Sequence, residues 1–189
     1  VVIDAEKKDI AAFAGDSEEA HCKGVEFEMS LAGVKPVPAD IVVTTNGGYP
    51  LDQNIYQSVK GMTAAEATCK EGGVIIDCTA CNDGHGGEDF FNTLKNAADL
   101  QKAMDEILAR DRNETIFDQW ESQILLRLLL HFHIILVTQA PREMVEAMHL
   151  TYAENIDEAF KLAKDYLAEK GVNDPKVTVI PDGVSVIVK

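Results

Sequence analysis

The chain has 189 residues, of which 32 are acidic and 17 basic, giving a formal net charge of -15. Hydrophobic residues make up 46% of it, enough for the core of a globular domain. An acidic surface repels phosphate backbones and anionic lipid, so neither nucleic acid nor a membrane is expected as a partner. The longest apolar stretches, 124–130 and 134–137, are far shorter than the ~20 residues that span a bilayer, so we expect a soluble protein.

The cysteines and the start of the chain bear on its location and its extent. Four cysteines are scattered along the sequence, and no basic segment followed by an apolar run opens it. This pattern does not resemble a disulfide framework or a signal peptide, so reduced thiols and a cytoplasmic location are expected. The chain starts at Val1, inside a strand-like run. We therefore expect it to be a fragment of something larger.

Residues 1–34 predict a hairpin followed by a helix. Two short strand-like runs, 1–4 and 10–15, flank a charged turn, a pattern typical of a β-hairpin. Asp16 is a good helix cap, and the helical pattern that follows it ends near Gly33. A segment with two prolines comes next and is interpreted as a linker.

From residue 35 to 172 strands and helices alternate, which predicts a three-layer, Rossmann-like α/β domain with a parallel sheet. The three clearest strands are near-continuously apolar and β-branched, as expected for strands buried on both faces. These strands are 40–45, 73–79 and 133–138, with a shorter one expected at 150–153. The predicted helices are 52–68, 88–95, 99–110, 118–132, 141–149 and 155–170.

The last segment, 173–189, predicts a second hairpin. Its strands, 176–180 and 184–188, are separated by Pro181-Asp182-Gly183, a typical turn sequence. This hairpin follows the α/β unit as the first hairpin precedes it, so we expect the two to share one accessory sheet.

The most informative candidate site follows the strand 40–45. A Gly-Gly loop and a helix with Asp52 at its cap come next, and helix N-termini at the carboxyl ends of parallel strands offer free N–H groups to anions. Gln57 and Lys60 share one face of this helix, where an amide and an ammonium group can hold a small carboxylate together. The same spacing is also typical of an ordinary solvated helix face. The loop does not match the dinucleotide-binding fingerprint.

A second candidate is the pair Cys78 and Cys81, with His85 four residues further on. Such a group is compatible with a redox dithiol or with part of a zinc site. Two buried structural cysteines are the preferred interpretation, because cysteine is among the most commonly buried residues. No histidine pair with helical metal-site spacing, nucleophile elbow or phosphate loop occurs in the sequence, so neither catalytic nor metal-binding residues are assigned.

The third candidate is the start of the helix 118–132. Asp118 and Glu121 have the spacing of a capping box, which gives both acids a structural role. Trp120 is the only tryptophan, and its position alone favours a place in the core.

The segment NGGYPLDQNIYQSVKG, residues 46–61, resembles the C-terminal half of the lactate racemase family, whose members use a nickel-pincer nucleotide. The segments NDGHGGEDFF and FDQWESQILLRLLL extend the resemblance over most of the chain. The resemblance implies a two-domain enzyme. Its N-terminal domain, which carries the cofactor lysine, the nickel-binding histidine and the acid/base histidines, lies outside this sequence, so the fragment is expected to be inactive alone.

The same resemblance assigns roles to four residues. Gln57 and Lys60 are expected to bind the substrate carboxylate, and Tyr56 and Trp120 to contact the cofactor, which reverses the expectation from position for Trp120. The implied reaction moves a hydride from a 2-hydroxy acid to the cofactor and returns it to the opposite face of a ketoacid, as in a racemase or epimerase. The expected division is residues 1–34 from the preceding domain, 35–172 as the C-terminal domain and 173–189 as a returning hairpin.

Two alternatives remain open on the sequence. One is an anion- or nucleotide-binding α/β module without catalysis, which would bind its ligand without a partner domain. The other is a thiol redox protein that uses Cys78 and Cys81, which requires a thiol of lowered pKa.

Overall fold

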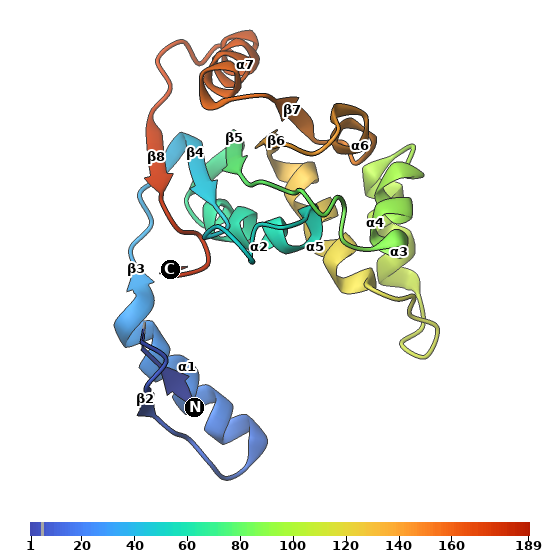
Figure 1. Cartoon of the computed structure of the whole chain (residues 1–189). Coiled ribbons are helices and arrows are strands. Elements are labelled where there is room, and N and C mark those ends of the chain that lie inside the picture. Colours follow the sequence, from blue (N-terminus) through green and yellow to red (C-terminus); the bar gives the residue numbers. More distant parts are fainter. Residues whose placement is uncertain (5) are drawn as a thin grey trace.

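The computed structural model describes residues 1–4 and 6–189. Its centre is a five-stranded sheet with the order β7-β6-β5-β4-β8, in which all neighbouring strands are parallel (Figure 1). The prediction of an α/β fold with a parallel sheet is confirmed. The five strands are β4 (Ala39–Thr45), β5 (Cys69–Cys78), β6 (His133–Val137), β7 (Thr151–Ala153) and β8 (Val177–Ile180).

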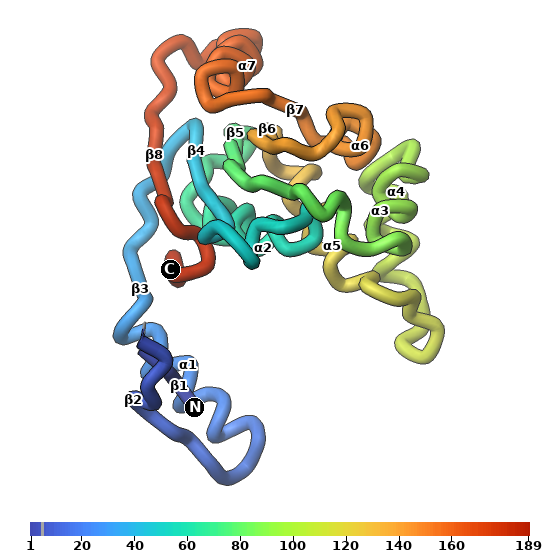
Figure 2. The backbone as a smooth tube through the Cα atoms, in the orientation of Figure 1, coloured from blue at the N-terminus to red at the C-terminus, as the bar shows by residue number. Residues whose placement is uncertain are grey.

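Helices cover both faces of this sheet (Figures 1 and 2). Helix α7 lies on one face, and α2 and α5, with α3 and α4 beside them, lie on the other. In the described part of the chain, no helix is both long and apolar enough to cross a bilayer. The helices are α2 (Ile55–Glu66), α3 (Glu88–Lys95), α4 (Leu100–Ala109), α5 (Gln119–His131), α6 (Arg142–Ala147) and α7 (Ile156–Glu169).

The central strands are apolar at nearly every position because successive side chains enter two different cores, one on each face of the sheet. Along β5, Ile75 packs toward α2 and α5, whereas Ile76 packs toward α7. On α7 the second core receives Ala159, Ala163 and Leu167, and its two small side chains let this helix lie close to the sheet. Burial on both faces therefore explains why no polar alternation marks these strands.

The N-terminal segment forms a separate unit beside the sheet domain. Strands β1 (Val2–Ile3) and β2 (Asp9–Ala11) make the predicted antiparallel hairpin. Helix α1 (Ser17–Ala32) starts after Asp16, whose carboxylate accepts hydrogen bonds from the next backbone N–H groups, as predicted. None of the residues of α1 is buried, and the segment extends from the body at the lower left of Figure 1.

The predicted second hairpin is wrong. Strand β8 does not pair with the strand that follows it but lies parallel to β4 and completes the main sheet. The last strand, β9 (Ile187–Val188), pairs in parallel with β3 (Gly33–Val34). The N-terminal hairpin therefore does not share an accessory sheet with the C-terminal segment, since β1-β2 and β3-β9 are separate sheets. The physical reason is that β8 satisfies the backbone N–H and C=O groups along the edge of β4, which a hairpin would leave unpaired.

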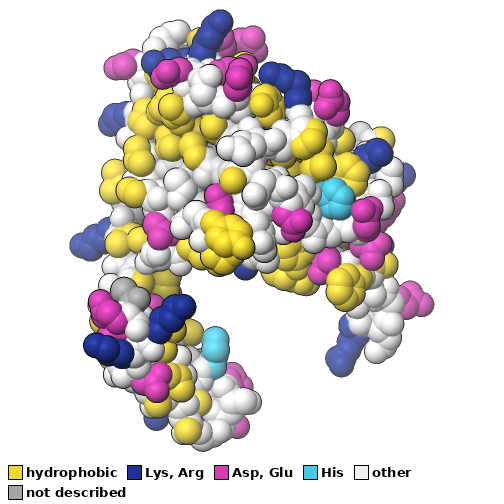
Figure 3. Space-filling model, viewed as in Figure 1, with side chains coloured by type: hydrophobic (Ala, Val, Ile, Leu, Met, Phe, Trp, Pro, Cys, Tyr) yellow, Lys and Arg dark blue, Asp and Glu magenta, His cyan; other side chains and the backbone are white. Residues whose placement is uncertain are grey.

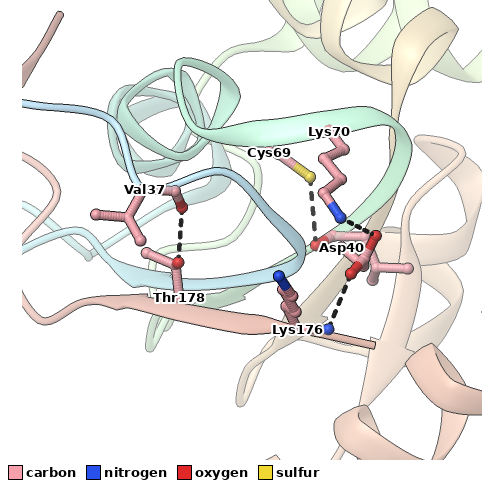
Figure 4. Close-up of polar contacts among 7 residues, drawn as sticks. Val37, Asp40, Cys69, Lys70, Lys176 and Thr178 are labelled. Atoms are coloured by element: carbon pink, nitrogen blue, oxygen red, sulfur yellow. Dashed lines mark hydrogen bonds and ion pairs between the residues drawn. The ribbon is translucent and has the colours of Figure 1, made fainter. Parts of the chain in front are cut away.

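Polar side chains attach β8 to the start of β4 (Figure 4). The Asp40 carboxylate binds the Lys70 ammonium and accepts from the backbone N–H of Lys176, each at 2.8 Å. These two partners hold the pKa of Asp40 below its usual value. The Thr178 hydroxyl donates to the Val37 carbonyl at 2.8 Å. The linker, β4 and β8 are thereby joined at one end of the sheet.

Candidate functional site

The usual ligand position of an open parallel sheet is filled by the chain itself. The strand order reverses between β4 and β8, and ligands commonly bind at the carboxyl ends of such a strand pair. Here the Thr45 hydroxyl donates to the Pro181 carbonyl at 2.8 Å, and the Gly183 N–H donates to the Thr45 carbonyl at 3.0 Å. A Cβ atom on Gly183 would lie 2.6 Å from Thr44 Oγ1 and 2.8 Å from the Thr45 carbonyl oxygen. A ligand site must therefore lie elsewhere on this edge.

The N-terminus of α2 is the next position along the edge, and its backbone donors are already used. The cap is Asn54, whose Oδ1 accepts from the Gln57 N–H at 3.0 Å. The N–H groups of Ile55 and Tyr56 donate to the carbonyls of residues 84 and 85, each at 3.1 Å. The expectation of free helix N–H groups for an anion is therefore wrong. Any anion at this place must be bound by side chains.

Asp52, predicted as the cap of this helix, has a different role. Its carboxylate accepts from the Ala80 N–H at 3.2 Å, and its carbonyl accepts from the Cys81 N–H at 2.9 Å. Asp52 thereby fixes the loop after β5 against the loop after β4. The helix cap lies two residues later than the sequence suggests, at Asn54, which adopts the extended conformation of a cap.

The predicted polar face of α2 is present. Lys60 is exposed, and its ammonium group donates to Gln57 Oε1. Ile55 and Val59, on the opposite side of the helix, are fully buried in the core. An ammonium group has three N–H donors, so two remain for a ligand. The helix thus presents one cation and one amide together at the surface.

Tyr56 brings α2 into contact with the start of α5. Its ring packs edge-on against Trp120, with centroids 5.9 Å apart, and against Phe90 at 5.4 Å. The Tyr56 hydroxyl donates to Asp118 Oδ1 at 3.2 Å. Trp120 is 53% exposed, so the expectation from its position that it lies in the core is wrong. The four residues singled out by the resemblance therefore lie on neighbouring turns of two touching helices.

The predicted capping box at the start of α5 does not form. Asp118 has a left-handed backbone (φ 56°), and its side chain makes no cap hydrogen bond. Glu121 is only 1% exposed, and its Oε1 has no hydrogen-bond partner among the described residues. The sequence indicated only a capping role for Glu121 and not its burial. Its spacing from the buried Leu125 and Leu128 places it on the apolar stripe of α5, and this was the available signal.

The two cysteines of the second candidate lie in environments that favour the protonated thiol. Burial raises the pKa of Cys78 to about 11 and also raises the pKa of Cys81. Cys81 Sγ lies 3.5 Å from the hydroxyls of Ser58 and Thr79. These contacts favour the structural interpretation over a reactive dithiol. Within residues 1–4 and 6–189, no group of three His, Cys, Asp or Glu side chains is arranged to hold a metal ion.

The surface around the site is uneven. In Figure 3 the N-terminal segment and a second projection extend from the body on either side of an open hollow. The connection between α4 and α5, residues 110–118, contributes the exposed side chains Ile116 and Phe117, which shortly precede the exposed Trp120 in the chain. Exposed apolar groups near a polar site are typical of a surface that meets another part of a protein.

Comparison with known proteins identifies the family. The model of the lactate racemase C-terminal domain matches residues 34–188. The chain belongs to this family. Lactate racemase from Thermoanaerobacterium thermosaccharolyticum is 55% identical to it over 190 residues, and lactate racemase from Lactiplantibacillus plantarum is 49% identical over 190 residues. Each alignment covers 100% of this chain and 44% of the relative.

One solved structure agrees with this assignment to the lactate racemase C-terminal domain family, and a second shows the same fold. The lactate racemase apoprotein from T. thermosaccharolyticum has a TM-score of 0.90 and 55% identity, over 100% of this chain and 45% of that one. A protein from Thermotoga maritima, with a TM-score of 0.55 and 15% identity, covers 91% of this chain and 42% of its own length, and it shares the fold only. The chain spans less than half the length of the curated relatives it matches.

Proposed function

We propose that this chain is the C-terminal, site-closing part of a racemase or epimerase of lactate or a related 2-hydroxy acid, with the N-terminal part of the same enzyme as its partner. The observation that carries the proposal is the grouping of Tyr56, Gln57 and Lys60 on α2 with Trp120 on α5. In a chain of the lactate racemase family, this cluster is the described surface best suited to a small anionic substrate.

In this proposal, Lys60 and Gln57 bind the substrate carboxylate. The ammonium neutralises the carboxylate, and the amide fixes its orientation through a hydrogen bond. Because the chain as a whole carries a charge of -15, positive potential is confined to positions such as Lys60. Two fixed contacts on the carboxylate hold the rest of the substrate in one place while its reacting carbon changes from tetrahedral to planar and back.

The aromatic pair fits a planar cofactor. The half-exposed indole of Trp120, supported by the edge of Tyr56, offers an apolar surface for a nucleotide ring. When bound, the nickel-pincer nucleotide supplies a reversible hydride acceptor, so that the 2-hydroxy acid passes through a ketoacid. Following the family resemblance, we assign the nickel ligands and the acid/base groups to the N-terminal part.

The proposed division of the enzyme follows the same reasoning. Residues 1–34, whose helix buries none of its side chains here, are assigned to the N-terminal part, and residues 35–172 to the closing domain. The segment 173–189 returns to the domain as β8 and β9 rather than as a hairpin. The four free cysteines support a reducing, cytoplasmic location.

The test is Lys60→Ala in the complete enzyme, with kinetics in both directions of lactate conversion. Loss of a charge-assisted contact worth ~3 kcal/mol should lower kcat/KM about 100-fold, while cofactor attachment, followed by absorbance and nickel content, stays unchanged. Lys164→Ala, an exposed lysine on α7 at the other face of the sheet, is the matched control. Wild-type kinetics in Lys60→Ala would remove this residue from the substrate site.

A second measurement tests the division of labour. The isolated chain, supplied with cofactor, should not convert lactate, because its described residues include no proposed acid/base group. Racemisation by the isolated chain would overturn the assignment of the reaction chemistry to the N-terminal part.

A further inference from the structure

Asp118 stands at the start of α5 in a conformation that differs from those of the other aspartates at helix starts. Asp16 and Asp99 precede α1 and α4, and their carboxylates accept hydrogen bonds from N–H groups of the next turn. Asp118 has a left-handed backbone with φ 56°, and its carboxylate makes no such bond. A left-handed backbone is uncommon outside glycine, and the lost cap gives up a stabilising contact. A residue that keeps two unfavourable features is a candidate for another role.

The carboxylate of Asp118 is directed at the neighbouring helix instead. Its Oδ1 accepts a hydrogen bond from the Tyr56 hydroxyl of α2 at 3.2 Å. Its Oδ2 lies against the backbone of Gly87, 3.2 Å from the position that a Cβ atom would take there. Burial and the hydrogen bond to Asp118 raise the pKa of Tyr56 to about 12. The phenol therefore stays protonated and is the donor of this bond.

The main chain of Asp118 starts the helix that carries Trp120. Its carbonyl accepts from the N–H groups of the buried Glu121 and Ser122, at 3.1 and 3.3 Å. The Trp120 ring meets the Tyr56 ring at an interplanar angle of 88°, with centroids 5.9 Å apart. Asp118 thus contacts Tyr56 through its side chain and sets the start of the helix of Trp120 through its backbone.

We propose that Asp118 is a positioning residue, which holds Tyr56 against Trp120 so that the indole keeps one orientation toward a planar cofactor ring. This inference rests on the proposed function, because it requires the aromatic pair to contact the cofactor. The left-handed backbone is part of the arrangement, since it turns the carboxylate away from the N–H groups of α5 and toward α2.

The role of Asp118 is separable from binding of the substrate carboxylate. The Lys60 ammonium donates to Gln57, on the polar face of α2, whereas Asp118 bonds to Tyr56. Loss of the Asp118 carboxylate should therefore affect the alignment of substrate and cofactor more than the affinity for lactate. Misalignment of reacting groups lowers kcat, and KM should change little.

The experiment compares Asp118→Gly and Asp118→Asn in the complete enzyme. Glycine adopts the left-handed backbone without steric strain, so Asp118→Gly removes the carboxylate alone. Its kcat should fall about tenfold, the scale of one hydrogen bond to a charged group. Asp118→Asn keeps an acceptor oxygen and tolerates the same backbone, so it should retain most of the activity. Asp99→Gly, at an ordinary cap on α4, is the matched control and should keep wild-type kinetics.

Tyr56→Phe tests whether Asp118 acts through the phenol. This variant keeps the ring and removes the donor. If the two residues act through one bond, adding Tyr56→Phe to Asp118→Gly should lower kcat no further. A double variant whose loss is the product of the two single losses would contradict the shared bond.

Fluorescence of Trp120 gives a readout that needs neither cofactor nor turnover. In the cofactor-free complete enzyme, the emission of Trp120 is the difference between each protein and its Trp120→Phe counterpart. Quenching of this emission by acrylamide should increase in Asp118→Gly and in Tyr56→Phe, because the indole loses a fixed neighbour. It should stay at the wild-type level in Asp118→Asn and Asp99→Gly. If Asp118→Gly does not fold, Tyr56→Phe, which leaves the backbone of Asp118 untouched, decides the question.

The two proposals fail in different ways. Unchanged kinetics in Lys60→Ala would contradict the proposed substrate site. Reduced turnover in Lys60→Ala, together with wild-type kcat and quenching in Asp118→Gly, would overturn only the role of Asp118. Equal losses of kcat in Asp118→Gly and Asp118→Asn would also overturn it, because asparagine keeps the acceptor.

Discussion

A second buried acid lies in the central strand of the sheet. Asp77 on β5 is fully buried, and neither of its carboxylate oxygens has a hydrogen-bond partner in the described structure. Burial and the nearby negative charge of Asp52 raise its pKa well above the usual value. Both effects favour the neutral form of this carboxyl. The stability of the folded chain is therefore expected to depend on pH through the ionisation of Asp77.

Asp77→Asn should stabilise the chain increasingly as the pH rises. Below about pH 4 the Asp77 carboxyl is neutral in both the folded and the unfolded chain, so ionisation takes nothing from the stability of the wild type. Because the folded-state pKa is raised, the carboxyl ionises first in the unfolded chain as the pH increases. The stability of the wild type therefore falls by up to ~1.4 kcal/mol per pH unit until the pH reaches the folded-state pKa. Urea denaturation of wild type and variant at roughly pH 5 and roughly pH 7 measures this difference. Asp165→Asn, an exposed acid on α7, should show no such trend, and an equal gain at both pH values would contradict the explanation.

Local spacing predicted some site residues and failed for others. Gln57 and Lys60 were predicted to lie together, because residues three apart on a helix always share a face, and they do. The cap of α2 was misplaced from Asn54 to Asp52, because both residue types cap helices and the choice depends on the loop after β5. Glu121 was interpreted as part of a capping box, since the left-handed backbone of Asp118 has no signature in the sequence.

At the level of elements, buried strands were predicted well and edge pairing was not. The main strands are apolar on both faces, and this composition identifies them without knowledge of their neighbours. The pairing of β8 with β4 joins residues more than one hundred positions apart, and the turn sequence between β8 and β9 gives no information about it. The contact of α2 with α5 through Tyr56 and Trp120 likewise depends on tertiary packing, which the local sequence of neither helix indicates.

Asn54→Ala tests the cap that positions the site on α2. Loss of a side-chain cap should cost about 1 kcal/mol of stability and let the first turn, which carries Tyr56 and Gln57, move. In the complete enzyme the KM for lactate should therefore increase. Asn155→Ala is the matched control, since Asn155 caps α7 in the same way, accepting from the Glu158 N–H at 3.0 Å. Equal kinetic effects of the two variants would show that only general stability was measured.

At the level of the whole molecule, the N-terminal segment and the sheet domain are separate in their packing. Phe13 and Phe27 join the hairpin to α1 at a centroid distance of 5.8 Å, whereas the exposed side chains of Val25 and Leu31 contribute nothing to the sheet domain. A segment of this kind is expected to pack against another part of the complete enzyme.

Deletion of residues 1–32 should leave the sheet domain intact. The truncated chain keeps β3 and its pairing with β9, and none of the removed helix is buried. Its urea midpoint should therefore match that of the whole chain, and its unfolding should stay cooperative. A large fall in the midpoint would show that the segment belongs to the core of this domain.

The loop that fills the space between β4 and β8 has a consequence for how substrate preference changes during evolution. Gly183 closes the position where backbone amides would otherwise bind a ligand, and the donors of α2 are used within the chain. Substrate recognition at the proposed site then depends on side chains alone, because the backbone donors beneath them are already hydrogen-bonded within the chain. Under the proposed function, new preferences among 2-hydroxy acids are therefore open to point substitutions on the helix surface, with the architecture of the sheet unchanged.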